Sequence, residues 1–344
     1  MKNISELRQD PITGAWVVIA TGRARRPHLF AQQKKQKVSS KKDCPFEELM
    51  KNARLVIDSG GEIHHLTEKN IKRLRRTWSL QVVPNKYPAL KEGRICPIEK
   101  PAGPHRWMEG VGFHEVIITK DHFRPIAFLE QKEVEQVVKS YRERFHALKD
   151  EDCVEYISVF HNHGKEAGAS ITHPHSQLIA TPVVPPDISR SLKGSQNYAH
   201  LHRGECIHCV LLTFELKEKK RIVYENKDMV VLCPYVSRTA FEIRIFPKRH
   251  SPRFEISYDD DLSTIADALR VALKKLYIGL HNPPHNFFIH TSPTSRTSEP
   301  DHYHWHIEII PKTDIWAGFD ISTGIEISSI APEVAARFLK NIKA

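Results

Sequence analysis

Two stretches of the chain repeat the same order of apolar patterns, strand, helix, strand and strand, and these two stretches are called the first and second repeat. Each repeat ends in a strand that carries two histidines separated by one residue. We therefore expect an α+β fold made of two similar units, each an antiparallel sheet with packed helices. In the first repeat the patterns cover 113–119, 134–148, 154–160 and 173–181. In the second repeat they cover 241–246, 262–276, 286–290 and 303–310.

The segment between the repeats, 181–204, is rich in proline, serine, arginine and histidine, a composition typical of a connection. It divides the chain into an N-terminal domain at 1–190 and a C-terminal domain at 200–344. A chain of 344 residues accommodates two domains of about 150 residues each. No apolar run is long enough to span a bilayer, and the polar N-terminus lacks the apolar stretch of a signal peptide. We therefore expect a cytoplasmic protein with no membrane partner.

Lysine and arginine together number 51 and aspartate and glutamate 41, which gives a formal net charge of +10. An excess of positive charge favours polyanionic partners, either nucleic acids or phosphorylated small molecules. Six cysteines are too few for a disulfide scaffold in a chain of this length, so we expect thiols. The sequence lacks the motifs of P-loop kinases, dinucleotide-binding dehydrogenases, zincin proteases and α/β-hydrolases. The 21 histidines are therefore the strongest candidates for catalytic and metal-binding residues.

The densest group of polar residues lies at the end of the first repeat. His173, His175 and Gln177 alternate along a predicted strand and so project to one face, beside a glycine-containing loop at 162–170. A neutral imidazole is a nucleophile near pH 7, and amide groups stabilise the non-bridging oxygens of a phosphoryl group. Two imidazoles and an amide on one face therefore indicate a site for attack on phosphorus.

Motifs along nearly the whole chain resemble those of the galactose-1-phosphate uridylyltransferase family, a duplicated member of the histidine-triad superfamily. The most specific of them is the His-Pro-His-Ser-Gln core at 173–177. The resemblance implies two tandem histidine-triad-like domains. The other matching motifs lie at 10–16, 23–27, 44–46, 82–90, 112–116, 241–250, 304–311 and 318–326.

The resemblance also implies a ping-pong transfer of a nucleoside monophosphate. By motif position, His175 is the nucleophile that takes UMP from UDP-glucose, and Gln177 binds the transferred phosphate. We expect one ring nitrogen of His175 to donate to a backbone carbonyl, because that bond fixes the tautomer. In the family the C-terminal positions contact the hexose, often across a dimer interface, so we expect a homodimer. The expected substrate-binding residues are Arg23, Arg26, Asn85, Asn162, Gly168, Ser170, Thr323, Gly324 and Glu326.

Two metal sites are implied by the same resemblance, so we expect one or two Zn²⁺ ions per chain. In the first, Cys44, His114 and His173 match family ligands. Glu47 stands where the family has a second cysteine; a carboxylate can bind zinc, so this site is either retained with an altered ligand or lost. In the second, four protein ligands would leave no open position, which predicts a structural role. This set resembles that of the plant ADP-glucose phosphorylase branch and comprises Cys206, Cys209, His250 and His304.

The favoured reaction is transfer of UMP from UDP-glucose to galactose 1-phosphate, which gives glucose 1-phosphate and UDP-galactose. The alternative is a nucleotide-sugar phosphorylase of the ADP-glucose type, in which inorganic phosphate accepts the nucleotide. A third hypothesis is a zinc-knuckle protein that binds nucleic acid, based on Cys206, Cys209 and the positive charge. The basic residues are dispersed without an aromatic-rich stripe, so we expect a nucleotide sugar and a sugar phosphate as partners, and no nucleic acid.

Overall fold

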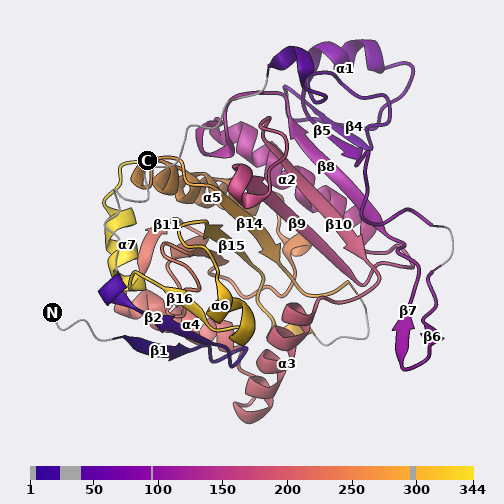
Figure 1. The fold of residues 1–344 in the computed structure, drawn as a ribbon. Coiled ribbons are helices and arrows are strands. Elements are labelled where there is room, and N and C mark those ends of the chain that lie inside the picture. Colours follow the sequence, from indigo (N-terminus) through magenta and orange to yellow (C-terminus); the bar gives the residue numbers. More distant parts are fainter. Residues whose placement is uncertain (1–4, 24–39, 94–95, 295–299) are drawn as a thin grey trace.

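One continuous antiparallel sheet runs across the molecule and carries strands of both repeats (Figure 1). A computed structural model describes residues 5–23, 40–93, 96–294 and 300–344, and within them this sheet has eleven strands. From one edge to the other they are β11 (Ile222–Glu225), β12 (Met229–Leu232), β13 (Ile243–Pro247), β15 (His306–Pro311), β14 (His285–His290), β9 (Tyr156–His163), β10 (His175–Thr181), β8 (Phe113–Thr119), β5 (Trp78–Pro84), β3 (Leu55–Asp58) and β4 (Ile63–His64).

The order of the strands shows the duplication directly. At the centre, β14 of the second repeat pairs with β9 of the first, with Asn286 opposite Asn162. Moving outward from this pair, β9, β10, β8 and β5 correspond to β14, β15, β13 and β12. The helices α2 (Gln131–Leu148) and α5 (Asp259–Gly279) occupy equivalent places in the chain and belong to the same apolar core. The prediction of two α+β units, each an antiparallel sheet with helices, is confirmed.

Side-chain periodicity explains which face of this sheet packs against α2 and α5. Along β15, Ile307 and Ile309 belong to the core that contains α2 and α5, whereas His306 and Glu308 point to the opposite face. Apolar residues of α2 recur at intervals of three and four and are buried from Val134 onward. Each such aliphatic side chain contributes about 1.5–3 kcal/mol when it leaves water. The polar residues of these strands therefore lie on the face away from α2 and α5.

The remaining elements surround this sheet. A three-stranded sheet is formed by β1 (Glu6–Gln9), β2 (Trp16–Ile19) and β16 (Glu326–Ser328), and a hairpin by β6 (Lys100–Ala102) and β7 (His105–Trp107). The other α-helices are α1 (Ile71–Thr77), α3 (Pro186–Leu201), α4 (Ile207–Glu218), α6 (Gly318–Thr323) and α7 (Pro332–Lys340). The short 3-10 turns are Thr21–Arg23, Lys41–Asp43, Ile126–Phe128, Lys165–Ala167, Phe254–Ile256 and Pro300–His302. No helix in the described part of the chain is both long and apolar enough to cross a lipid bilayer.

Two expectations from the sequence need correction. The connection expected at 181–204 is mostly the helix α3, because its prolines lie before or at the first helical position, where a missing N–H costs nothing. The expectation of six thiols is also wrong, because Cys96 and Cys153 form a disulfide with their Cα atoms 5.0 Å apart. These two cysteines are 57 residues apart in the sequence, so no local pattern pairs them.

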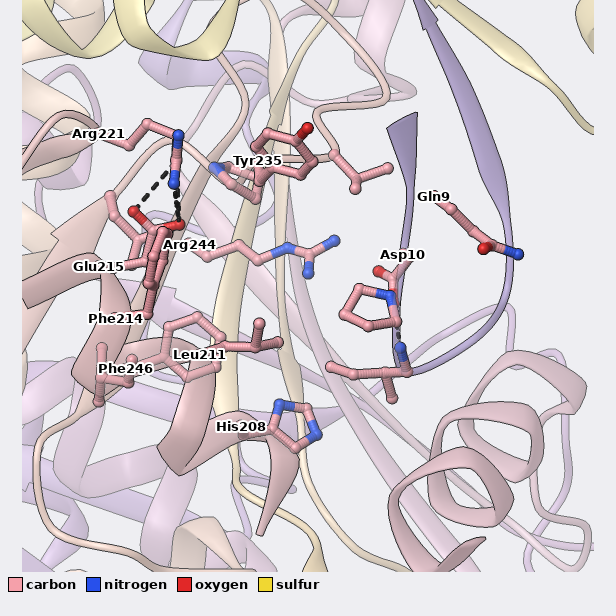
Figure 2. A pocket seen from close by; sticks show the side chains of 16 residues that line it. Gln9, Asp10, His208, Leu211, Phe214, Glu215, Arg221, Tyr235, Arg244 and Phe246 are labelled. Atoms are coloured by element: carbon pink, nitrogen blue, oxygen red, sulfur yellow. Dashed lines mark hydrogen bonds and ion pairs between the residues drawn. The ribbon is translucent and has the colours of Figure 1, made fainter. Parts of the chain in front are cut away.

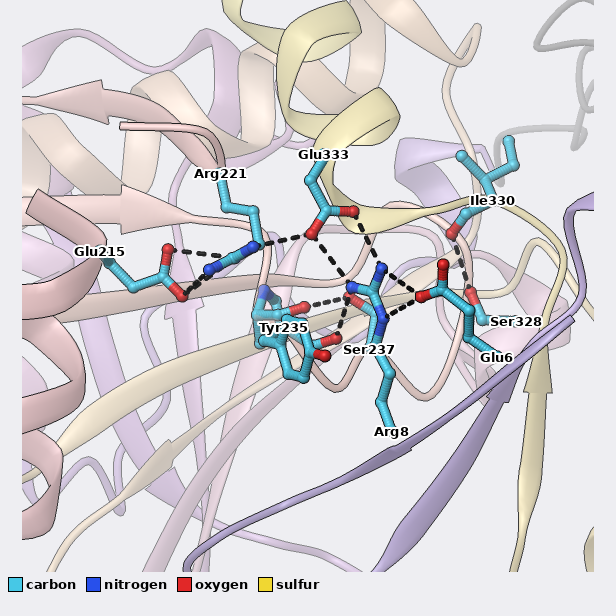
Figure 3. A network of polar contacts seen from close by, with 10 residues as sticks. Glu6, Arg8, Glu215, Arg221, Tyr235, Ser237, Ser328, Ile330 and Glu333 are labelled. Carbon is cyan, nitrogen blue, oxygen red and sulfur yellow. Dashed lines mark hydrogen bonds and ion pairs between the residues drawn. The ribbon is translucent and has the colours of Figure 1, made fainter. Parts of the chain in front are cut away.

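A network of ion pairs joins the two ends of the chain (Figure 3). Glu333 of α7 lies 3.0 Å from Arg8 of β1 and 2.7 Å from Arg221, which precedes β11. Arg221 also contacts Glu215 of α4 at 2.8 Å. The Arg8 and Arg221 side chains are only 7% and 6% exposed. Burial disfavours a charged carboxylate, but hydrogen bonds from Arg8 and Arg221 outweigh burial and lower the pKa of Glu333.

Replacing Glu333 with alanine should lower the free energy of unfolding by about 2–3 kcal/mol, because two buried guanidinium groups lose their shared partner. Urea denaturation at pH 7 measures this loss. Since folding lowers the pKa of Glu333, its contribution is present above the unfolded value and is lost as the pH falls through the folded value. The matched control is Glu218→Ala, which removes the 2.7 Å pair with the exposed Lys220 and should leave stability nearly unchanged. Equal losses in both variants would contradict the network's role.

Candidate functional site

His175 is the first residue of β10, and its ring is held in one tautomer. Nδ1 lies 2.8 Å from the carbonyl oxygen of His173. A carbonyl oxygen can only accept, so Nδ1 carries the proton, and Nε2 of the neutral ring has a free lone pair. His175 is 9% exposed, and burial lowers its pKa. The expected hydrogen bond to a backbone carbonyl is confirmed, and a neutral ring with a bare Nε2 can act as a nucleophile.

Gln177 lies two residues further along the same strand, close to His114 and Asn85. Pairing of β10 with β8 sets Gln177 opposite Val116 and His114 opposite Ile179, so Gln177 and His114 are diagonal neighbours on one face. The Oε1 atom of Gln177 is 2.9 Å from Nε2 of His114. The Nδ2 atom of Asn85, just after β5, is 3.0 Å from the same nitrogen. The structure therefore brings the predicted residues Gln177 and Asn85 together through His114.

Asn162 and Gly168 form another part of this neighbourhood. The Oδ1 atom of Asn162 accepts a hydrogen bond from Nδ2 of Asn286 at 2.8 Å. Gly168 has a φ of +89°, which favours glycine, and a Cβ atom built there would lie 3.7 Å from Nδ2 of Asn162. Ser170 is exposed on the loop that leads from Gly168 to His173. Asn162 and the loop are thus adjacent, at the end of the strand next to β10.

The remaining predicted substrate-binding residues lie elsewhere in the fold. Thr323 ends α6, Gly324 follows it, and Glu326 begins β16. This strand pairs with β2 in the three-stranded sheet, separate from the sheet that carries His175 (Figure 1). Arg23 ends a short 3-10 turn, and Arg26 lies outside the described residues.

A first group of possible metal ligands contains His173, whose carbonyl oxygen accepts the hydrogen bond from His175. One ligand atom from each of four residues lies within 4.8 Å of the others. Nδ1 of His173 is 3.5 Å from Sγ of Cys44 and 3.4 Å from Oε1 of Glu47. Nε2 of His173 donates to the carbonyl oxygen of Thr119 at 2.7 Å, which turns Nδ1 toward the group. The four residues are Cys44, Glu47, His122 and His173.

His122 takes the place that the sequence prediction gave to His114. His114 lies near the start of β8, and its ring contacts Gln177, whereas His122 follows the end of that strand and contacts Glu47. A comparison of the two repeats supports His122 as the ligand, because its position after a strand matches that of His250. His122 is three residues past Thr119, the last residue of β8, just as His250 is three residues past Pro247, the last residue of β13.

The second predicted group is assembled as expected from the sequence. Its four ligand atoms also lie within 4.8 Å of one another, and Sγ of Cys209 is 3.3 Å from Nδ1 of His250 and 3.4 Å from Nδ1 of His304. Ligand atoms of a tetrahedral zinc site with sulfur and nitrogen donors are about 3.5 Å apart. Hydrogen bonds from Cys209 and the two histidines lower the pKa of the Cys206 thiol, so a thiolate is available. These residues fit zinc.

Both histidines of the second group have their outer ring nitrogens fixed. Nε2 of His304 donates to the carbonyl oxygen of Pro247 at 2.9 Å, and Nε2 of His250 donates to that of Asp301 at 2.8 Å. Such bonds orient the inner nitrogen toward a metal. His304 thereby repeats the arrangement of His173 with Thr119 in the first repeat.

A third group, His290, His306 and Glu308, has a different character. Glu308 contacts Arg238, and its Oε1 atom is 3.0 Å from Nε of Arg244. The carboxylate is already neutralised by two guanidinium groups, which disfavours a bound cation. His306 and Glu308 are the counterparts of His175 and Gln177, and a carboxylate in place of the amide has no N–H group to donate to a phosphate oxygen. The second repeat is therefore unsuited to the chemistry of the first.

A separate pocket of about 450 Å³ lies over the second repeat (Figure 2). It is bounded by α4, by β12 and β13, and by the turn after β1. Arg244 points into it toward Asp10, and most of the wall is apolar, with Leu211, Phe214 and Phe246 among its side chains. Neither His175 nor Gln177 lines this pocket.

Two α+β repeats joined in one sheet, one of them with a histidine and an amide side by side on one strand, define the histidine-triad class of fold. A family model described as galactose-1-phosphate uridyl transferase, N-terminal domain, matches residues 1–185, more than half of the chain. A model of a domain of unknown function (DUF4921) matches residues 105–344. The chain belongs to the galactose-1-phosphate uridyl transferase family, as its motifs suggested, and it is a nucleotidyltransferase.

Relatives within this family are similar over nearly their whole length. ADP-glucose phosphorylase of Arabidopsis thaliana is 32% identical over 341 residues, which cover 98% of this chain and 93% of that protein. Galactose-1-phosphate uridylyltransferase of Thermotoga maritima is 30% identical over 345 residues, which cover 97% and 98%. The crystal structure of the Arabidopsis ADP-glucose phosphorylase with bound ADP-glucose has a TM-score of 0.79 at 30% identity, over 99% of this chain and 100% of that one.

Replacing His122 with alanine should remove about one equivalent of zinc from the purified protein, because it deletes one of the four ligands of the first group. His114→Ala is the matched control and should keep the full zinc content, since its ring is directed at Gln177. Elemental analysis of the two variants beside the wild type gives the answer. Loss of zinc from His114→Ala but not from His122→Ala would restore the original ligand assignment.

Cys206→Ser combined with Cys209→Ser should lower the melting temperature strongly while changing the turnover of the remaining folded protein much less. Four protein ligands leave no open position for substrate, so this zinc would stabilise the fold and take no part in the reaction. Calorimetry and activity are compared in one preparation, with Cys233→Ser as the control, because Cys233 is a buried free cysteine outside both groups. An unchanged zinc content in the double variant would refute this ligand set.

Proposed function

We propose that this protein transfers UMP from UDP-glucose to galactose 1-phosphate through a covalent intermediate on Nε2 of His175. The observation that supports this most directly is the 2.8 Å hydrogen bond from Nδ1 of His175 to the carbonyl oxygen of His173. It leaves Nε2 unprotonated, so that this nitrogen has a lone pair to attack phosphorus, in a ring that is largely buried.

The location that we expect for this protein, the cytoplasm, stays a prediction.

The reaction has two half-reactions with the same chemistry. In the first, Nε2 of His175 attacks the α-phosphorus of UDP-glucose, the bond to the bridging oxygen breaks, and glucose 1-phosphate leaves. The carbonyl of His173 keeps its hydrogen bond to Nδ1 while positive charge develops on the ring. In the second, a phosphate oxygen of galactose 1-phosphate attacks the same phosphorus, UDP-galactose leaves, and the imidazole of His175 is restored.

Amide groups around His175 bind the negative charge that this reaction moves. The NH₂ group of Gln177 donates to the non-bridging oxygens of the transferred phosphoryl group, where charge increases in the transition state. Asn162, Asn85, Gly168 and Ser170 hold the ribose and phosphates, as do Arg23 and Arg26. Glu326 lies on another sheet, with Thr323 and Gly324 just before it, and we propose that these three residues reach the hexose in the active site of a partner subunit, which requires a homodimer.

Both metal groups suit zinc, and we propose one ion in each. When bound, zinc supplies a cross-link among its ligands. In the first repeat that cross-link holds His173, whose backbone carbonyl orients His175. The unusual ligand is Glu47, which offers a carboxylate oxygen where Cys209 offers sulfur in the second group.

The second candidate function is phosphorolysis of ADP-glucose, with inorganic phosphate as the acceptor. The observation that favours it is the 32% identity to ADP-glucose phosphorylase, beside 30% to a uridylyltransferase. The covalent chemistry at His175 is the same in both reactions, so they differ in the base that is bound and in the acceptor.

Incubation with UDP-glucose should add the mass of UMP to the intact protein, and incubation with ADP-glucose should add none. His175→Gly should abolish the adduct while the melting temperature stays close to that of the wild type. The control is His65→Gly, because His65 is exposed and its Nδ1 atom lies 3.2 Å from the backbone carbonyl oxygen of Arg54, away from β10. An AMP adduct formed from ADP-glucose instead would select the phosphorylase reaction, and an adduct mapped to His173 would overturn the site.

A further inference from the structure

His114 has one ring nitrogen whose role is fixed by the backbone. The N–H of Ala89 lies 3.0 Å from Nδ1 of His114 and donates to it. A backbone N–H can only donate, so Nδ1 must be the unprotonated nitrogen, and the ring proton lies on Nε2. Ala89 belongs to the segment after β5, so this bond also anchors that segment to β8.

The proton on Nε2 has one suitable acceptor. Nε2 of His114 is 2.9 Å from Oε1 of Gln177 and 3.0 Å from Nδ2 of Asn85. The orientation of Asn85 is fixed, because its Oδ1 atom accepts from the N–H of Tyr87 at 2.9 Å. Its Nδ2 atom is therefore an NH₂ group, which cannot accept. His114 consequently donates to Oε1 of Gln177.

This donation decides which end of the Gln177 amide faces the substrate. A glutamine side chain can rotate by half a turn and exchange its oxygen with its nitrogen at little cost in shape. With Oε1 held by His114, the NH₂ group is left to point elsewhere, and it has no hydrogen-bond partner among the residues that the structure describes. The opposite rotamer would present an oxygen to a phosphate and repel it.

We propose that His114 is a positioning residue for nucleotidyl transfer, one that fixes Gln177 with its NH₂ group toward the transferred phosphoryl group. The inference rests on the proposed function, since it concerns how the residue beside His175 is prepared. Nothing in the reaction requires His114 to touch the substrate. Its effect passes through a single hydrogen bond between neighbouring strands.

The same arrangement occurs at a second amide of the site. Oδ1 of Asn162 accepts from Nδ2 of Asn286 at 2.8 Å, which leaves the NH₂ group of Asn162 free to donate. Nδ2 of Asn286 also donates to the carbonyl oxygen of Ala167 at 2.8 Å, so its own orientation is fixed. Two amides near His175 thus have their oxygens occupied by protein donors, as expected of a site that binds an anion.

Two substitutions of His114 separate its two hydrogen bonds. Asparagine places an oxygen near the position of Nδ1, so His114→Asn can accept from Ala89 but cannot reach Gln177. Glutamine places an NH₂ group near the position of Nε2, so His114→Gln can donate to Gln177 and gives up the bond to Ala89. A merely structural role for His114 predicts that the asparagine variant is the better of the two, and positioning predicts the reverse.

The experiment measures formation of the His175 adduct in a single turnover, with whichever nucleotide sugar labels the wild type. His114→Asn should form the adduct roughly 10-fold more slowly, with KM for the nucleotide sugar changed much less, because the lost contact acts on the transition state. His114→Gln should restore most of the rate. Gln177→Ala should be slower by roughly 10²-fold, by analogy with the removal of an oxyanion donor.

The double variant His114→Asn with Gln177→Ala gives the decisive comparison. If His114 acts through Gln177, the double variant is as slow as Gln177→Ala alone, because there is no amide left to orient. Rates that multiply, or an asparagine variant as fast as the wild type, overturn the inference while the adduct itself still supports the proposed function. A wild-type protein that forms no adduct with any nucleotide sugar overturns both.

Discussion

The backbone carbonyl of His173 is the contact on which the rest of the site depends. It accepts the proton of Nδ1 of His175 at 2.8 Å, and so determines which nitrogen of that ring can attack. The position of this carbonyl is set in turn by the side chain of the same residue. Nε2 of His173 is fixed by Thr119, and Nδ1 faces Cys44 and Glu47. The first metal group and His175 are thus coupled through His173, and Pro174 lies between these two histidines in the sequence.

The second repeat has the same geometry, but a different residue stands in place of the amide. Nδ1 of His306 is 3.1 Å from the carbonyl oxygen of His304, and Nε2 of His304 donates to Pro247, as His175 and His173 do in the first repeat. The difference lies at Glu308, which stands where Gln177 would be and pairs with Arg238 and Arg244. The duplicated backbone holds His306 in the same tautomer as His175, whereas Glu308 has no N–H group to offer a phosphate oxygen.

Much of this site was predictable from the sequence, because strand alternation and ligand spacing are local properties. The shared face of His175 and Gln177 follows from strand alternation, and the pairing of Cys206 with Cys209 follows from their spacing. The other two ligands of the second metal group, His250 and His304, were supplied by the family resemblance. The exchange of His114 for His122 was missed because both histidines flank β8 and the resemblance favoured His114, although the spacing of His250 in the second repeat pointed to His122. The disulfide between Cys96 and Cys153 was missed because contacts distant in sequence leave no periodic trace.

The pairing of β9 with β14 has a consequence for how such a protein can evolve. Asn286 belongs to the second repeat, yet it orients Asn162, which lies in the first repeat near His175. Cutting the gene between the repeats would leave two unpaired central strand edges and a disoriented amide. The second repeat therefore cannot change in sequence as freely as an independent duplicate can. A constraint on Asn162 in the first repeat is also a constraint on Asn286 in the second.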